Sequence, residues 1–192
     1  MIRADVASRA PHARKHGTTF AETWRSADGG TIVAVGAVLA GADPVVVSDL
    51  LRTGARALVT SRKALGAALG ALDRVVRKHA QEHRDDELAA AVVLMAFGDD
   101  EHDVEIAGAG QLHAALVDGS GAQRPLHGRA GALGTGIESH DAERVHLRRD
   151  DVIVAATVAL PAGWWDAEPR TADGLVHRSG EHDAAAALVA QL

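Results

Sequence analysis

The residues best suited to chemistry in this sequence are acids and histidines that lie near the ends of apolar segments. Five of them offer groups that bind divalent cations: Asp43, Asp173, His177, His182 and Asp183. Carboxylate oxygens bind Mg²⁺ and Mn²⁺, and imidazoles bind zinc. However, the spacing of the last three matches no recognised ligand pattern. The simpler interpretation makes Asp43 the N-cap of a helix and the others solvated loop residues.

A strand-to-helix junction in the first quarter of the chain lacks the chemistry that such a place often carries. The segment VGAVLAGADP, residues 35–44, joins an apolar β-branched run to a helical pattern. Many enzymes place an acid or a phosphate-binding loop where a strand ends and a helix begins. Here the junction offers only Ala37, Val38, Leu39 and Ala40.

Composition and charge restrict the classes of function. The chain has 192 residues, 47% of them apolar, which fits one domain over residues 1–192 with a substantial core. The net charge is −6 and the basic residues are dispersed, so we expect no nucleic-acid partner. The sequence contains no Cys, which excludes thiol nucleophiles and disulfides. It also lacks a bilayer-length apolar run and a signal-peptide core, so we expect a cytoplasmic protein without membrane contact.

Hydropathy periodicity predicts the elements that must position these residues. Apolar residues recur at helical spacing after Pro44, and two helices are predicted over Pro44–Thr60 and Ser61–Gln81. Short alternating or unbroken apolar runs predict strands on both sides of this helical pair. The predicted strands are Ile2–Ala10, Thr18–Arg25, Thr31–Val38, Leu88–Gly98, Val104–Gly110, Leu112–Val117, Gln123–Leu126, Glu143–Arg148, Val152–Val158 and Ala184–Val189.

This order predicts an α+β fold, a β-sandwich of mostly antiparallel strands flanked by helices. The segment between the last two strands is rich in loop residues, and TADG at residues 171–174 is interpreted as a turn. The same segment contains Trp164-Trp165. Neighbours in an extended chain face opposite sides, so one Trp is a candidate recognition anchor, unless both cover the edge of the core.

Several short motifs follow one another in the order of a known family. They are Ala109-Gly110, Asp118-Gly119 and Leu133-Gly134, followed by RVHLRRDDVIVAATVAL at residues 144–160 and EHDAAAALVAQL at residues 181–192. Over nearly the whole chain the sequence resembles the PPM-type (type 2C) metal-dependent protein phosphatases. Within them it is similar to the bacterial branch of stage II sporulation protein E and RsbX. The resemblance implies an α-β-β-α sandwich.

The resemblance also implies two-metal phosphoester hydrolysis, in which aspartates at strand ends hold two Mg²⁺ or Mn²⁺ ions. The positions that correspond to the acids of the family carry other residues here. They are Thr18, Ala37, Val38, Val158, Ala159 and His182, and of the terminal acid pair only Asp183 remains. Loss of both metals returns a barrier of roughly 20 kcal/mol. We therefore expect no catalytic residue, no metal and no cofactor.

The resulting hypothesis is a pseudophosphatase that acts as a protein-binding regulatory module in stress-response or sigma-factor partner switching. The partners implied are a phosphoprotein, an anti-sigma-factor antagonist, a kinase or an active phosphatase. The two predicted helices are the candidate surface for such a partner or for a homodimer. The alternative is an active phosphoserine or phosphothreonine phosphatase whose Mg²⁺ or Mn²⁺ ligands have been rearranged. A third possibility is a structural subunit that supports an oligomer.

Overall fold

The described part of the chain forms two five-stranded sheets and three α-helices. The computed structural model describes residues 2–9, 18–26, 29–60, 64–97, 102–126, 131–136, 141–160, 164–166, 170–180 and 183–191. Within these ranges the elements are β1 (Ile2–Arg9), β2 (Thr19–Arg25), β3 (Thr31–Ala40), α1 (Pro44–Thr60), α2 (Leu65–His83), β4 (Ala89–Phe97), β5 (Asp103–Ala109), β6 (His113–Val117), β7 (Gln123–Pro125), β8 (Glu143–His146), β9 (Val152–Ala156), the 3₁₀ turn η1 (Trp164–Asp166), α3 (Ala172–Ser179) and β10 (Ala184–Gln191).

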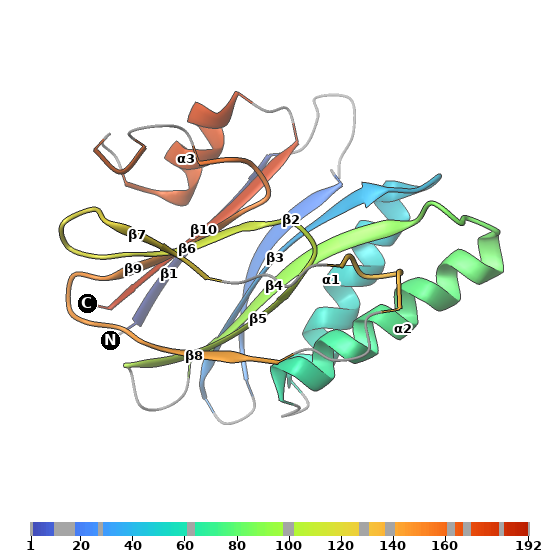
Figure 1. The fold of residues 1–192 in the computed structure, drawn as a ribbon, viewed down its shortest axis with the longest axis horizontal. Helices are drawn as coiled ribbons and strands as arrows, with labels where there is room; N and C mark the ends of the chain where they lie inside the picture. Colours follow the sequence, from blue (N-terminus) through green and yellow to red (C-terminus); the bar gives the residue numbers. More distant parts are fainter. Residues whose placement is uncertain are drawn as a thin grey trace.

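The two sheets pack face to face with helices outside them (Figure 1). Sheet A has the strand order β1-β10-β9-β6-β7 and sheet B the order β2-β3-β4-β5-β8. All pairings between these strands are antiparallel. Helices α1 and α2 cover the outer face of sheet B, and α3 covers part of sheet A. The predicted α+β sandwich is confirmed. None of the described helices is both long and apolar enough to cross a bilayer.

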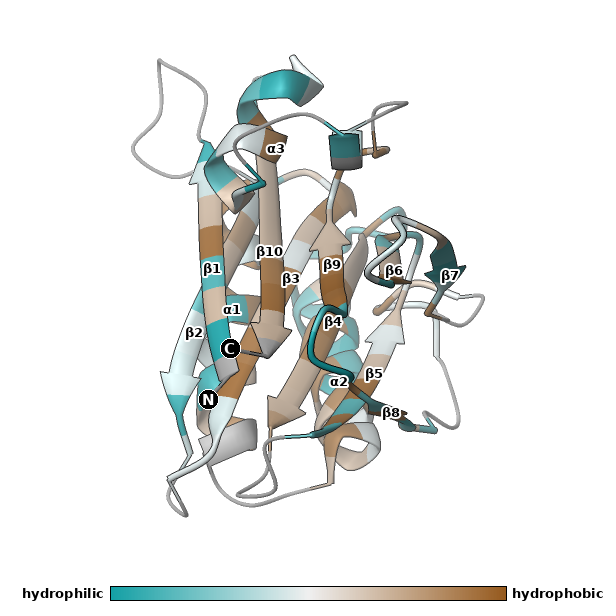
Figure 2. Cartoon of the chain, turned by 90° about the vertical axis from the view of Figure 1, so that its left-hand side faces the viewer, coloured by the Kyte–Doolittle hydropathy of each residue, from teal (hydrophilic) through white to brown (hydrophobic). Residues whose placement is uncertain are grey.

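Three layers of apolar side chains hold the sandwich together. The helix-side core lies between sheet B and the α1–α2 pair, the central core between the two sheets, and the outer core between sheet A and α3. Strand β3 contributes to two of them, because Ile32 faces the helix-side core while Val33 faces the central core. Burial on both faces explains why β3 and β4 read as unbroken apolar runs. In Figure 2 strands β3, β4, β9 and β10 are mostly brown, and teal appears on β7, β8, α3 and parts of α1 and α2.

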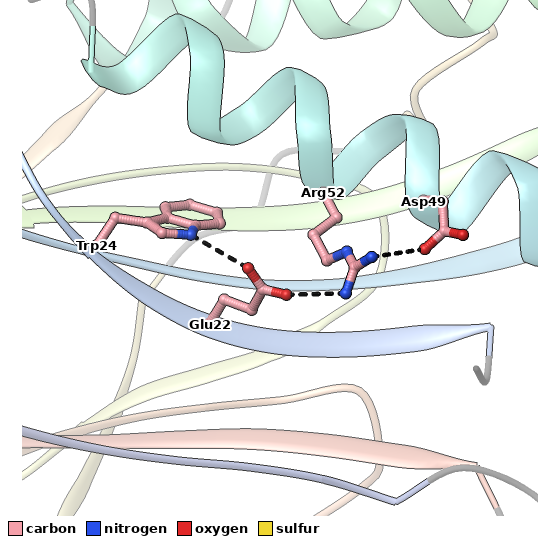
Figure 3. A network of polar contacts seen from close by, with 4 residues as sticks. All are labelled: Glu22, Trp24, Asp49 and Arg52. Carbon is pink, nitrogen blue, oxygen red and sulfur yellow. Dashed lines mark hydrogen bonds and ion pairs between the residues drawn. The ribbon is translucent and has the colours of Figure 1, made fainter. Parts of the chain in front are cut away.

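A polar network fixes α1 against the edge strand β2 (Figure 3). The Glu22 carboxylate accepts hydrogen bonds from Trp24 Nε1 at 3.1 Å and from the Arg52 guanidinium at 3.2 Å. Arg52 also donates to Asp49 Oδ1 at 2.9 Å. Exposed ion pairs stabilise a protein by only about 0–1 kcal/mol, so this network fixes the orientation of α1 more than it adds stability.

The interpretation of TADG as a turn is wrong, because this segment begins helix α3. Thr171 is the N-cap residue, and its hydroxyl accepts a hydrogen bond from Gly174 N–H at 3.0 Å. Gly180 ends the helix with φ at 73°. A helix of eight residues buries only Ala172, Leu175 and Val176, too few positions to produce a clear apolar period.

Other predicted boundaries shift by a few residues. Strand β3 continues to Ala40, so two residues of the junction are extended chain. Helix α2 ends at His83, where Arg84 takes a left-handed conformation with φ at 54°. Trp164 is 2% exposed and packs in the outer core, which confirms that one Trp of the pair covers the core. The Trp165 side chain lies outside the described part of the structure.

Candidate functional site

The ends of β2, β3 and β10 meet at one end of the sandwich, and they bring together most of the predicted site positions. Val38 N–H donates to Thr18 O at 2.9 Å, and Ala37 lies opposite Thr19 in the β2–β3 register. Asp183 directly precedes β10 and contacts the start of β2. Thr18, Ala37, Val38 and Asp183 therefore form one cluster, which we call the strand-end cluster. His182 lies outside the described residues.

Asp183 is held by three donors from the start of β2. Its Oδ2 accepts hydrogen bonds from the Thr18 backbone N–H and the Thr18 hydroxyl, both at 2.6 Å. Its Oδ1 accepts a hydrogen bond from the Thr19 hydroxyl at 2.5 Å. Hydrogen bonds to an ionised carboxylate are stronger than those between neutral groups. Asp183 thus connects sheet A to sheet B across 165 positions of sequence.

The Thr157–Ala159 segment reaches the same end of the sandwich but does not add a ligand to the strand-end cluster. Thr157 N–H donates to Ala185 O, and Ala185 N–H donates to the Thr157 hydroxyl, both at 3.0 Å. Val158 is 9% exposed and packs in the outer core with Trp164. Ala159 is exposed. The predicted site position Val158 is therefore part of the outer core.

The junction between β3 and α1 presents an apolar surface beside the strand-end cluster. Leu39 and Val46 are each 48% exposed, and they are the exposed large apolar residues among the described part of the chain. The turn between them is fixed by the Asp85 carboxylate, which accepts a hydrogen bond from Ala42 N–H at 2.7 Å. The chain keeps a well-formed strand-to-helix turn at a place where the side chains are aliphatic.

Two of the three glycine motifs mark close contacts between backbones. Gly110 has φ at 83°, and a Cβ there would lie 2.4 Å from Ala91 Cβ. Its N–H donates to Gly131 O at 2.7 Å. Gly134 has φ at 98°, and a Cβ there would lie 2.8 Å from Leu88 O. Because L residues with side chains rarely adopt such φ values, both positions require glycine.

A buried carboxylate that the sequence did not point to fastens this glycine loop to α2. Asp73 is fully buried, and its Oδ1 accepts a hydrogen bond from Gly134 N–H at 2.8 Å. Its Oδ2 lies 2.9 Å from Arg77 Nε, one turn further along the helix. A buried charge is retained only where it is paired, and Asp73 has both a cation and a backbone donor. No local pattern marks it, because Gly134 lies 61 positions away.

The third motif, Asp118-Gly119, forms the turn between β6 and β7. Asp118 Oδ1 accepts hydrogen bonds from the Ser120 hydroxyl at 2.6 Å, from Ser120 N–H at 2.9 Å and from Ala122 N–H at 3.0 Å. The hydrogen bond from the Ser120 hydroxyl, followed by the two backbone donors, lowers the pKa of Asp118 below its ordinary value. Asp118 is thus occupied by the turn and serves to shape it.

The groups in the strand-end cluster do not suit a pair of hard dications. Mg²⁺ and Mn²⁺ need several anionic or carbonyl oxygens at close range. Among the described residues of the cluster the one carboxylate is Asp183, and both of its oxygens accept hydrogen bonds from threonine. Nor do three or more His, Cys, Asp or Glu side chains gather as a metal site anywhere in the described ranges. The described residues therefore do not fit a two-metal centre.

This architecture, with helices outside two antiparallel sheets and strand ends converging on one site, defines the class of PPM-type phosphatase folds. The model of the family described as Stage II sporulation protein E (SpoIIE) matches residues 28–158, more than half of the chain. The chain belongs to this family. No curated protein is similar enough in sequence to count as a match.

Solved structures agree with this class at low sequence identity. The S. agalactiae serine/threonine phosphatase has a TM-score of 0.76 and 12% identity, with 100% of both chains covered. RsbX in complex with magnesium has a TM-score of 0.72 and 9% identity, covering 98% of this chain and 94% of that chain. The RsbU and RsbW domains of a Mycobacterium tuberculosis protein give 0.72 and 20%, covering 97% of this chain and 59% of that chain. The TM-scores show a shared fold.

Proposed function

We propose that this chain is a PPM-family domain that does not hydrolyse phosphoesters and acts in the cytoplasm by binding a protein partner. The observation that carries this proposal is the state of Asp183, whose two carboxylate oxygens are engaged by the amide and hydroxyl of Thr18 and the hydroxyl of Thr19. A threonine donor stands where a second acid would be needed, and alanine and valine occupy the β3 positions.

The proposal depends on these replacements because phosphoester hydrolysis in this family requires metal ions held by acids. Metal ions in such sites polarise the phosphoryl oxygens and generate hydroxide from a bound water. Methyl groups and hydroxyls at the ends of β2 and β3 supply neither function. Phosphate monoesters are among the slowest substrates to hydrolyse without catalysis, with enzymatic accelerations up to ~10²¹. A domain of this fold that binds no metal ions acts through the contacts that its surface makes with other proteins.

The partner belongs to phosphoserine-based partner switching, and it is a phosphoprotein, an anti-sigma-factor antagonist, a kinase or an active phosphatase. Membership of the stage II sporulation protein E family and the shared fold with RsbX and the RsbU domain support this assignment. The partner surface is the α1–α2 layer with the adjoining junction, where Leu39 and Val46 are exposed. Exposed apolar patches mark protein–protein interaction sites.

The absence of catalysis is tested by a calorimetric Mn²⁺ titration and by turnover of p-nitrophenyl phosphate in the same buffer. We expect no heat beyond dilution and no turnover above the buffer rate, because the strand-end cluster offers one carboxylate that is already engaged. Heat of binding together with turnover that disappears in Asp183→Ala, but persists in the exposed control Asp86→Asn, would establish the active alternative instead.

The binding surface is tested with a charge placed on it. Val46→Asp on α1 is expected to weaken capture of the partner from the native cytosol at least tenfold, because a carboxylate in an apolar interface loses its hydration without gaining a pair. Gln123→Asp on β7, in the other sheet and exposed, is the control and should capture as the unchanged chain does. Equal capture by both variants would remove α1 from the interface. Light scattering on the same samples identifies the partner as a second copy if the mass doubles.

A further inference from the structure

The C-terminal end of α2 carries two histidines, one turn apart, that the fold and the proposed function leave without a role. His79 and His83 are four residues apart in the segment HAQEH, residues 79–83, so they lie on one face of the helix. Their imidazole ring centroids are 4.2 Å apart, with 33° between the ring planes. His79 is half-buried and His83 is exposed, so both rings are reachable from solvent.

We propose that His79 and His83 form a bidentate binding site for a late first-row divalent cation, Zn²⁺, Ni²⁺ or Cu²⁺. Neutral imidazole nitrogen is a preferred ligand of these ions, whereas Mg²⁺ and Mn²⁺ prefer oxygen. Two histidines one helical turn apart present their nitrogens to a single ion, as in zinc sites built on one helix. With Zn–N distances of about 2.0–2.1 Å, two rings that already lie in contact need only side-chain rotation to share the ion.

The electrostatic surroundings favour a cation at this position. The pair lies at the C-terminal end of a 19-residue helix, with His83 in its last turn, where the backbone carbonyls give the helix a partial negative charge. The segment from residue 78 to residue 87 also contains four acids, Glu82, Asp85, Asp86 and Glu87, against two basic residues, Lys78 and Arg84. A locally acidic helix end raises the concentration of cations around the two imidazoles.

The site is a binding site and not a catalytic one. Glu82 occupies the position of the acid in an H-x-x-E-H zinc motif, but its carboxylate lies 3.7 Å from Lys78 Nζ on the exposed face of the helix. No third His, Cys, Asp or Glu joins the pair among the residues that the structure describes. Two imidazoles therefore fill two positions of the ion, and water fills the others. The site is separate from the strand-end cluster and independent of the proposed loss of phosphatase activity.

The test compares the full chain with His79→Ala, with His83→Ala and with His113→Ala as the matched control. His113 is an exposed histidine on β6 of sheet A, whereas α2 packs against sheet B. Zinc affinity is measured by competition with a chromogenic chelator. Copper is located by ¹H–¹⁵N NMR, in which a substoichiometric amount of Cu²⁺ broadens the amide signals around its ligands.

We expect the unchanged chain and His113→Ala to bind Zn²⁺ at least tenfold more tightly than either α2 variant, with copper broadening centred on residues 76–87. The same concentration of Mg²⁺ should leave these signals unchanged. Each variant is first checked for an unchanged unfolding midpoint without metal, and His83→Ala serves if His79→Ala disturbs the helix. Equal zinc affinity in all four proteins, or broadening centred outside α2, would overturn the proposal.

Discussion

Replacing Asp183 with asparagine is expected to lower the free energy of unfolding by about 2 kcal/mol, since hydrogen bonds to a charged group contribute about 1.5–3 kcal/mol each and the amide keeps part of them. The carboxylate receives three donors from Thr18 and Thr19 and connects the two sheets. Denaturant unfolding followed by circular dichroism, in a buffer containing a chelator, measures the change. Thr19→Val removes one donor, and a double-mutant cycle with Asp183→Asn should give a favourable coupling energy.

The sign of the change in unfolding free energy distinguishes two roles for Asp183, a metal ligand and a structural hydrogen-bond acceptor. An acid that belongs to a cluster of metal ligands suffers repulsion from its neighbours when the ions are absent, so neutralising it stabilises the metal-free protein. Where hydrogen-bond donors hold the acid, as they do at Asp183, the same change removes charge-assisted hydrogen bonds and destabilises the protein. Asp86→Asn, in the exposed turn after α2, is the matched control and should change the free energy of unfolding by no more than about 0.5 kcal/mol. An unfolding midpoint for Asp183→Asn above that of the unchanged chain would contradict a stabilising role for the hydrogen bonds between Asp183 and the two threonines.

Gly110→Ala is the second large effect, and it is expected to lower the free energy of unfolding by roughly 2–5 kcal/mol or to prevent folding. A left-handed backbone costs an L residue about 1–2 kcal/mol, and overpacking a tight site costs about 1–3 kcal/mol more. Both terms apply here, since φ is 83° and the added Cβ would lie 2.8 Å from Ala91 Cα as well as 2.4 Å from Ala91 Cβ. Solubility after expression and denaturant unfolding with fitted m-values measure the loss.

Gly180 provides a matched control that separates the steric contribution to this loss of stability from the backbone contribution. Gly180 has φ at 73°, yet nothing lies within 4 Å of a Cβ placed there. Gly180→Ala should therefore show the backbone cost alone, about 1–2 kcal/mol. If the two variants lose the same stability, the close approach of β4 and β5 at Gly110 is not what requires glycine.

The sandwich could be predicted because the hydropathy patterns of its strands and long helices reflect which of their faces are buried. β4 is apolar throughout because both of its faces are covered, and α1 shows a helical period because one face alone is buried. Helix α3 was missed because eight residues and three buried side chains do not establish a period. Its real signals were the Thr171 N-cap and the Gly180 C-cap, which are also typical of turns.

The site could be predicted in outline and not in its bonding. The order of the motifs placed Thr18, Val38 and Asp183 at converging strand ends, and the structure brings these three together. The threonine donors around Asp183 and the hydrogen bond between Asp73 and Gly134 depend on contacts between distant parts of the chain. Such pairs leave no local pattern, because hydroxyl and carboxyl groups are ordinary at any exposed position.

The hydrogen bonds between Thr18 and Asp183 also limit which substitutions the site can accept. A single Thr18→Asp change would set two carboxylates against each other in a spot that now contains a donor and an acceptor. Acids introduced here one at a time would therefore weaken the connection between the two sheets before enough ligands were present to bind an ion.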